Sequence, residues 1–423
     1  MKQLFLSIFL SFNICIAYVQ QPAKINEAVF LHRAQQELTN ILIADQFSLP
    51  VSIRIYTYSN IAAYEVLAAA NKQFSSLHKT DKRFPDLSSL TPSENVHLPL
   101  AAVYAYLLTG KNFVYHEQQL NDALVRILQD FRLPGSDHAA VQASLNYGAQ
   151  IAEAVYNWSG NDNYRQIRSI TPYVVLNNPG KWIPTPPFNI AALEPYWGRM
   201  RCLVMDSASQ FQPQATINFE ENSNSEFYQQ AKQVQLAVNN LNATEKATIA
   251  YWNDKHSIAT KWLSIAESVC SQFNADIYKT AKTFTMTSLA MYDGMISCWD
   301  IKYRSNLLRP ETFIRAKIDK AWNPYLKSLP TPEYTSHTAL LSEAAAVVLS
   351  SLYGEKKPFT DQPEIQHSPR TFSSFHAAAV EVAASDLNSG VSFPQSIRSG
   401  REQGFQVGSL LVKKHLLSLF AYN

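Results

Sequence analysis

The chain has 423 residues, of which 46% are hydrophobic and 17% charged, and its formal net charge is +2. This composition is typical of a globular protein with a large core, and the near-neutral charge argues against nucleic acid or an anionic membrane surface as a partner. Only 12 glycines occur, which argues against a β-sandwich or a glycine-rich α/β sheet.

The N-terminal stretch MKQLFLSIFLSFNICIAYVQQ has the features of a secretory signal peptide. Lys2 precedes an apolar run that is too short for a comfortable membrane span, and Cys15-Ile16-Ala17 offers a cleavage site before Tyr18. A lipid anchor at Cys15 is the weaker alternative, because bulky Ile14 stands where a small residue is expected. We therefore predict a signal peptide over 1–17, an exported mature protein (periplasmic or extracellular), and no membrane span after cleavage.

Most of the remaining chain predicts helices, because strong helix formers recur with apolar residues at helical spacing. In chain order, the predicted helical segments are Asn60–Asn71, Ser136–Trp158, Ser264–Tyr303, Ala339–Gly354 and Ser374–Leu387. The long segment Ser264–Tyr303 is expected to form two helices with a break near Asn274, and Gly354 is expected to cap the C-terminus of its helix.

The stretch Thr171–Gly198 is rich in proline and aromatic residues, so it cannot form one long helix. We expect an ordered loop whose aromatic side chains pack against the helices, because a disordered linker would not carry so many large apolar residues. No repeat or low-complexity segment divides the chain. The sequence therefore predicts an all-α fold with one domain over 18–423.

Three cysteines lie outside the predicted signal peptide: Cys202, Cys270 and Cys298. Their spacing matches no zinc motif, so no metal site is predicted. One disulfide is conceivable in an oxidising compartment, but three is an odd number, and small buried residues are the favoured interpretation.

The stretch KYRSNLLRP, Lys302 to Pro310, carries two cations seven residues apart. On one helix they would lie on nearly the same face, and Pro310 would place Arg309 at the helix end, free to reach into a cleft. Ser336 follows about twenty-five residues later, directly before an alanine-rich helix. It is either an ordinary N-cap or part of an anion site at the helix N-terminus, and both roles are compatible.

These stretches resemble the vanadium-dependent haloperoxidases and the related type 2 phosphatidic acid phosphatases. AMYDGMISCWDIKYRSNLLRPETFIR, PTPEYTSHTALLSEAAAVVL, IRIYTYSNIAAYEVL and WIPTPPFNIAALEPYWG carry the resemblance over most of the mature chain. It implies a core of two packed helical bundles, with the motifs in about 264–423. It also implies a cleft that holds vanadate or phosphate, in which Lys302, Arg309 and Ser336 would bind the oxyanion.

Two of the three family motifs depart from the family pattern. Where the second motif has P-S-G-H, His337 falls on the glycine and Thr338 on the catalytic histidine. Where the third has S-R-x5-H, Asp386 falls on the arginine and Ser392 on the histidine that binds vanadium or attacks phosphorus. At about 5 Å and an effective dielectric near 20, an attraction of roughly 3 kcal/mol for the oxyanion becomes a repulsion of the same size. Losing the nucleophile costs orders of magnitude in rate.

The leading interpretation is a degenerate oxyanion site in a binding or interaction protein, with no cofactor and with a small anion or a protein as partner. The alternative is an active phosphatase or haloperoxidase-like enzyme that uses vanadate or phosphate, with His337 or His376 in an altered mechanism. Related haloperoxidases often assemble, so a homo-oligomer is conceivable. We further expect Asp386 to form an ion pair with Arg309 or Lys302, in place of the oxyanion, because unpaired buried cations are costly.

Overall fold

The computed structural model describes residues 26–69, 74–131, 138–186, 189–213, 218–253, 257–362 and 368–417. The predicted signal peptide at 1–17 lies outside these ranges. Within them, no helix combines the length and the apolar character needed to cross a membrane.

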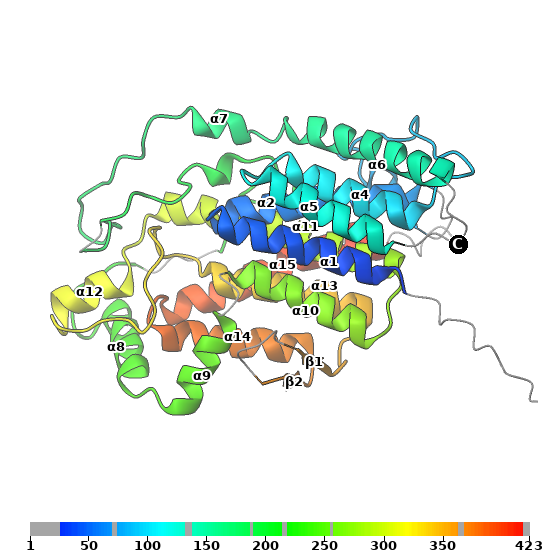
Figure 1. Ribbon diagram of the computed structural model, residues 1–423. Helices are drawn as coiled ribbons and strands as arrows, with labels where there is room; N and C mark the ends of the chain where they lie inside the picture. Colours follow the sequence, from blue (N-terminus) through cyan, green and yellow to red (C-terminus); the bar gives the residue numbers. More distant parts are fainter. Residues whose placement is uncertain are drawn as a thin grey trace, which may run out of the picture.

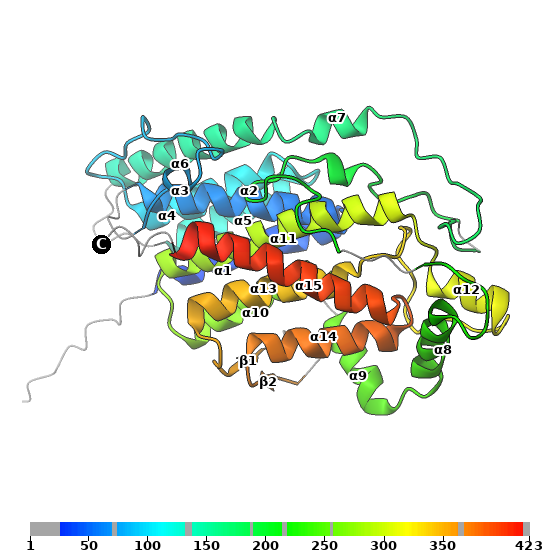
Figure 2. The same ribbon diagram turned by 180° about the vertical axis from the view of Figure 1, so that it is seen from behind.

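Most of the long helices run roughly parallel to one another along the long direction of the molecule (Figure 1; Figure 2 shows the reverse side). The first part of the chain forms one group of them: α1 (Ala28–Ala44), α2 (Leu49–Ala68), α3 (Leu77–Thr80), α4 (Leu98–Lys111), α5 (Glu117–Asp130), α6 (His138–Ser159) and α7 (Tyr164–Arg168). A long connection that contains the short 3-10 helix η1 (Trp197–Arg199) then leads to the second part.

The second part contributes a further group of helices and a small antiparallel hairpin. In chain order its helices are α8 (Glu226–Asn239), α9 (Ala243–Trp252), α10 (Ile258–Gln272), α11 (Ile277–Ser305), α12 (Pro310–Lys317), α13 (His337–Tyr353), α14 (Phe375–Ser389), α15 (Pro394–Leu411) and the π-helical turn η2 (Val412–Leu417). Strands β1 (Phe359–Asp361) and β2 (Arg370–Phe372) pair with Phe359 opposite Phe372. The prediction of an all-α fold is therefore confirmed.

Helix α11 joins the two groups of helices. It contacts α1 and α2 from the first part and α10, α13 and α15 from the second. Nearly every side chain from Phe284 to Trp299 in this helix is fully buried. As a result, one continuous cluster of buried apolar side chains extends from Ala28 to Leu416.

The predicted helical segments all occur, with bounds that differ at their ends. The break near Asn274 is found between α10 and α11, where Asn274 has a φ of 49° and the Asp276 side chain caps α11. Gly354 caps α13 as expected. The first segment was predicted too short, because α2 already begins at Leu49.

The proline-rich stretch is a loop, as expected, and in its described part it is anchored by buried tryptophans. Trp182 and Trp197 are both 0% exposed. The Leu193 carbonyl accepts hydrogen bonds from Trp299 Nε1 (3.1 Å) and from the Tyr303 hydroxyl (2.7 Å). This loop therefore covers the C-terminal half of α11, the helix that carries Lys302.

One expectation about local geometry was wrong. Lys302 and Arg309 do not share a helix, because α11 ends at Ser305 and Asn306 follows in the left-handed conformation with a φ of 49°. Arg309 is instead the extended N-cap residue of α12, which begins at Pro310. The two cations reach a common region because the chain turns between the helices.

Candidate functional site

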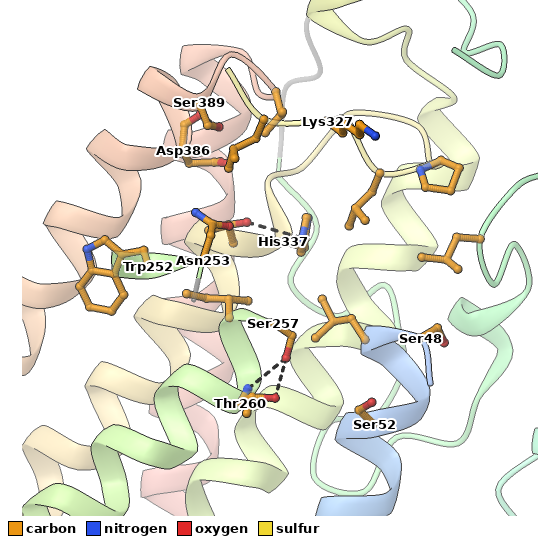
Figure 3. Close-up of a pocket in the computed structure, with 18 of the residues that line it drawn as sticks. Ser48, Ser52, Trp252, Asn253, Ser257, Thr260, Lys327, His337, Asp386 and Ser389 are labelled. Atoms are coloured by element: carbon orange, nitrogen blue, oxygen red, sulfur yellow. Dashed lines mark hydrogen bonds between the residues drawn. The ribbon is translucent and has the colours of Figure 1, made fainter. Parts of the chain in front are cut away.

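A cavity of about 520 Å³ opens at the place where the three family motifs converge (Figure 3). Arg309, His337 and Thr338 line it, together with Ser385, Asp386 and Ser389 from α14. The opposite side is formed by the junction of α1 and α2 and by the start of α10, with Ser48, Ser52, Ser257 and Thr260 among its residues. Residues remote in sequence thus meet around one space.

Both predicted cations lie beside this cavity, and both are buried. Lys302 Nζ donates to the carbonyls of Glu333 (2.7 Å) and Pro332 (3.2 Å). Burial lowers the pKa of Lys302 to about 8. The ammonium group therefore donates hydrogen bonds to peptide carbonyls rather than to a carboxylate.

Arg309 is held in a similar way. Its Nε donates to the Thr331 carbonyl (2.8 Å), Nη2 to the Thr331 hydroxyl (2.6 Å) and Nη1 to the Val391 carbonyl (3.1 Å). Burial lowers the pKa of the guanidinium, but arginine keeps its charge in proteins. Every nitrogen of this side chain already has a protein acceptor.

Ser336 and Asp386 form the most direct contact at the site. The Ser336 hydroxyl donates to Asp386 Oδ2 at 2.5 Å and accepts the Ala339 N–H at 3.1 Å, as the N-cap of α13. Burial raises the pKa of Asp386, and hydrogen bonds from Ser336 and Ser392 together with the charges of Lys302 and Arg309 oppose that rise. The hydroxyl expected to bind an oxyanion is therefore bonded to a carboxylate.

The expected ion pair between Asp386 and a cation was wrong in its geometry. Among the described residues, Lys302 and Arg309 donate to carbonyls and to the Thr331 hydroxyl, and the Asp386 carboxylate accepts from Ser336 and Ser392. Asp386 still lies close enough to both cations for their charges to act on its pKa. The charges of Asp386 and the two cations therefore interact across the protein interior, without a direct contact between the side chains.

A second buried carboxylate, Glu333, was not identified from the sequence. It is 0% exposed and accepts hydrogen bonds from the Phe393 N–H (2.9 Å) and from the Ser396 hydroxyl. Burial raises its pKa, while Lys302 and Arg309 act to lower it. We call Lys302, Arg309, Glu333 and Asp386 the buried charge cluster. Its only sequence signal was an acidic residue beside the serine motif, in an otherwise uncharged stretch.

His337 and Thr338 begin α13 and face the cavity. Burial, together with the charges of Lys302 and Arg309, holds the pKa of His337 well below its ordinary value, so its imidazole is neutral at physiological pH. Its ring lies edge-on to Trp299, with 5.8 Å between ring centroids, and its Nε2 is 3.5 Å from the Thr338 hydroxyl. A neutral imidazole can accept a hydrogen bond here.

His376, the other histidine considered, does not line this cavity. Its Nδ1 lies 2.7 Å from Glu343 Oε1, and Arg401 Nε donates to the other oxygen of Glu343 at 2.8 Å. These residues connect α14, α13 and α15. His376 therefore lies outside the cavity, and its location does not support the alternative mechanism that uses it.

Neither a metal centre nor a disulfide is found in the part of the chain that the structure describes. No three histidine, cysteine or acidic side chains gather there with the geometry for a metal ion. Cys202, Cys270 and Cys298 are free thiols in that part, and the last two are buried. Burial raises the pKa of Cys298, which disfavours a reactive thiolate beside the site.

The buried charge cluster is neutral overall when its four groups are ionised, since two cations stand with two carboxylates. A bound anion would add a third negative charge and would have to displace Asp386 from Ser336. Chemically, the site offers a neutral imidazole, hydroxyl groups and a carboxylate, all beside a largely apolar cavity. This arrangement suits hydrogen bonding to an uncharged group better than the capture of an oxyanion.

Residues 282–419 match the family described as the VCPO second helical-bundle domain. The structure is similar to that of a bacterial vanadium-dependent iodoperoxidase, with 34% identity, a TM-score of 0.86, and coverage of 93% of this chain and 98% of that one. Holo and apo structures of a bacterial vanadium-dependent chloroperoxidase match with TM-scores of 0.67 and 0.65. At 18% identity, they show likeness of fold alone; they cover 88% and 86% of this chain and 93% of their own. No curated protein sequence matches.

Proposed function

The chain belongs to the vanadium haloperoxidase superfamily, and we propose that it is a member without the family's vanadate or phosphohistidine chemistry, acting instead as a binding protein. The single observation that carries this proposal is the bond from Ser336 to Asp386. It places a buried carboxylate where the resemblance predicts an arginine facing the oxyanion.

The donor set does not fit vanadate or phosphate. Arg309 and Lys302 are engaged by backbone carbonyls, and the Ser336 hydroxyl is engaged by Asp386. Ser392 occupies the position where the family has its essential histidine, and a serine hydroxyl cannot replace imidazole as a vanadium ligand or as a phosphorus nucleophile. His337 does supply an imidazole, but it stands at the position of the motif's glycine, on the first residue of α13.

Export is part of the proposal and rests on the N-terminal sequence alone. The apolar run after Lys2 and the small-residue cleavage site support secretion of the mature chain. An N-terminal sequence of the protein purified from its native cells tests this directly. A first residue of Tyr18 is expected.

Vanadate binding tests the proposed loss of chemistry. Calorimetric titration of the wild-type protein at neutral pH should show no saturable binding of vanadate or phosphate. Assays of iodide and bromide oxidation with peroxide, and of phosphomonoester hydrolysis, should show no turnover above buffer. Micromolar vanadate affinity, or turnover that the substitution His337→Ala abolishes, would refute the proposal and favour an enzyme acting through His337.

A matched double variant makes a negative result informative. Asp386→Arg with Ser392→His returns a cation and an imidazole to the positions that the resemblance assigns to them. If the fold retains the pocket shape, this variant should gain vanadate affinity over the wild type by at least about tenfold, because one repulsive charge becomes attractive. Comparable affinity in both proteins would show that Asp386 is not what excludes the oxyanion.

A further inference from the structure

Apolar and hydrogen-bonding side chains both line the cavity. The apolar ones come from the α1–α2 junction and from the loop before α13, and they include Leu42, Phe47, Leu49, Leu326 and Leu329. Asp386, His337 and Thr338 supply hydrogen-bonding groups at what we call the polar end, and the hydroxyls of Ser48, Ser52, Ser257 and Thr260 lie across the cavity from them. A volume of about 520 Å³ lies within the range of small-molecule sites, and such sites combine apolar walls with a few placed polar groups.

Among the described residues that line the cavity, three side chains carry charge, namely Arg309, Asp386 and Lys327. Arg309 is buried and its nitrogens donate to Thr331 and Val391, so its charge is offset within the buried charge cluster. Lys327 is exposed on the loop before α13, where water and salt screen its charge. His337 adds no charge, because its pKa is held far below neutrality.

This balance sets the charge of a ligand that could bind at the polar end. An anion would meet the Asp386 carboxylate, and a cation would meet the fields of Lys302 and Arg309, which already act on that carboxylate. In either case the ligand would bring an uncompensated charge into the cavity, which would weaken its binding. An uncharged hydroxyl group avoids this cost and can donate to either a carboxylate or a neutral imidazole.

We propose that the cavity binds an uncharged, hydroxyl-bearing apolar molecule, an alcohol or a phenol. Its hydroxyl group donates to Asp386 or His337, and its hydrocarbon part contacts the leucine-rich wall. The inference rests on the proposed function, because a bound vanadate or phosphate would occupy the same polar end.

Three probes of similar shape but different charge test this inference on the full-length mature protein. Phenethyl alcohol, phenethylamine and phenylacetate carry the same ring with a neutral, a cationic and an anionic end group at neutral pH. Ligand-observed NMR titration should show the alcohol binding about tenfold or more tightly than either charged probe. The inference is overturned if all three probes bind equally, if a charged probe binds more tightly than the alcohol, or if none of them binds.

Two variants then locate the binding. Leu329→Trp, in the half-buried loop wall, should fill the cavity and abolish alcohol binding. Asp386→Asn should remove the negative charge and raise the ratio of phenylacetate to alcohol affinity by about tenfold or more. Circular dichroism verifies that each variant folds. Alcohol binding that Leu329→Trp leaves intact places the probe elsewhere and overturns the inference.

The result separates this inference from the proposed function. If vanadate does not bind and the alcohol does not bind either, the loss of the family chemistry stands and only the ligand class is wrong. If vanadate binds with micromolar affinity, the proposed function is wrong, and the polar end then belongs to the oxyanion.

Discussion

At the scale of single residues, Asp386 has the largest influence on the site. It is buried, it accepts the Ser336 hydroxyl, and its charge acts on both Lys302 and Arg309. In a low-dielectric interior, a residue of this kind stabilises the cations beside it only as long as its own hydrogen bonds are satisfied. We therefore expect the same carboxylate to oppose the binding of an oxyanion, as proposed above, and to keep two buried cations compatible with the fold.

Asp386→Ala should lower the free energy of unfolding by about 2–4 kcal/mol, because it leaves two buried hydroxyls without their acceptor and two buried cations with one counter-charge fewer. Adding phosphate should restore part of that loss, since an anion that binds the folded state stabilises it by mass action. Urea unfolding in phosphate-free buffer and in phosphate measures both effects.

Asp386→Asn is the matched control, because it keeps a hydrogen-bond acceptor at the same place and removes only the charge. In phosphate-free buffer, it should lower the free energy of unfolding by less than the alanine substitution does. An alanine variant as stable as the wild type in both buffers would contradict the role assigned to Asp386.

At the scale of elements, α13 owes its position to close packing against α15. Gly400, Gly404 and Gly408 recur every fourth residue on α15 and meet the backbone of α13. A Cβ atom at Gly404 would lie 2.1 Å from the Leu340 carbonyl oxygen, and one at Gly400 would lie 2.5 Å from that of Ser336. These glycines allow the approach that places Ser336 and His337 at the cavity.

Gly404→Ala should therefore destabilise the protein by about 1–3 kcal/mol, because the new methyl group meets a backbone atom that cannot move aside easily. Phe405→Ala on the next position is the control, since Phe405 is 52% exposed and its replacement should change stability by less than about 0.5 kcal/mol. Denaturant unfolding of the two variants compares them. Equal effects would show that the contact between α13 and α15 is loose.

The His376–Glu343–Arg401 network links three helices and gives stability a pH dependence. The hydrogen bond to Glu343 raises the pKa of His376, and bonds from His376 and Arg401 lower that of Glu343. A raised histidine pKa contributes stability that is fully present below the ordinary value of 6.5 and is lost as pH rises through the higher folded value. The lowered pKa of Glu343 keeps its own contribution present above 4.5 and loses it at more acid pH.

The difference in unfolding free energy between wild type and His376→Gln should thus be larger near pH 6 than near pH 8. The difference should be modest, because His376 is partly exposed and water screens its charge. Urea unfolding of both proteins at the two pH values gives the comparison, in which other titrating groups cancel. A difference that is the same at both pH values would mean that His376 is not charged in the folded protein.

At the scale of the whole molecule, a fully buried ion pair connects parts of the chain that are far apart in sequence. Lys261 Nζ lies 2.9 Å from Asp361 Oδ2, both side chains are 0% exposed, and the Tyr251 hydroxyl donates to the same oxygen at 2.6 Å. Through these contacts the hairpin strand β1 is attached to α9 and α10. Neither residue of the pair lines the cavity of the candidate site.

Asp361→Asn should lower the free energy of unfolding by about 3–5 kcal/mol, because it leaves a buried ammonium group without its counter-charge. The double variant Lys261→Met with Asp361→Leu removes both charges and should recover most of the loss, since apolar replacement of a buried pair is often neutral. Thermal or urea unfolding of both variants tests the idea. A double variant less stable than the single one would show that the pair itself contributes net stability.

The helices were largely predictable from the sequence, whereas the contacts of the site were not. Apolar periodicity, the capping glycine Gly354 and the break at Asn274 are local signals, and each was found where it was expected. The one domain predicted over 18–423 remains a prediction. The prediction that Lys302 and Arg309 share one helix was wrong. Pro310 was used to place the helix end, but the left-handed turn at Asn306 ends the helix earlier.

The sequence by itself determined the fold class and the family, because these depend on residue type and order. That Asp386 and Ser392 replace family residues remains a prediction from the resemblance. Only the tertiary structure decided what these side chains contact. It placed Asp386 on Ser336 instead of on a cation, added Glu333 to the buried charge cluster, and separated His376 from the cavity. The physical reason is that hydrogen-bond partners and the burial of charge depend on how α11, α13, α14 and α15 come together, which no local stretch of sequence specifies.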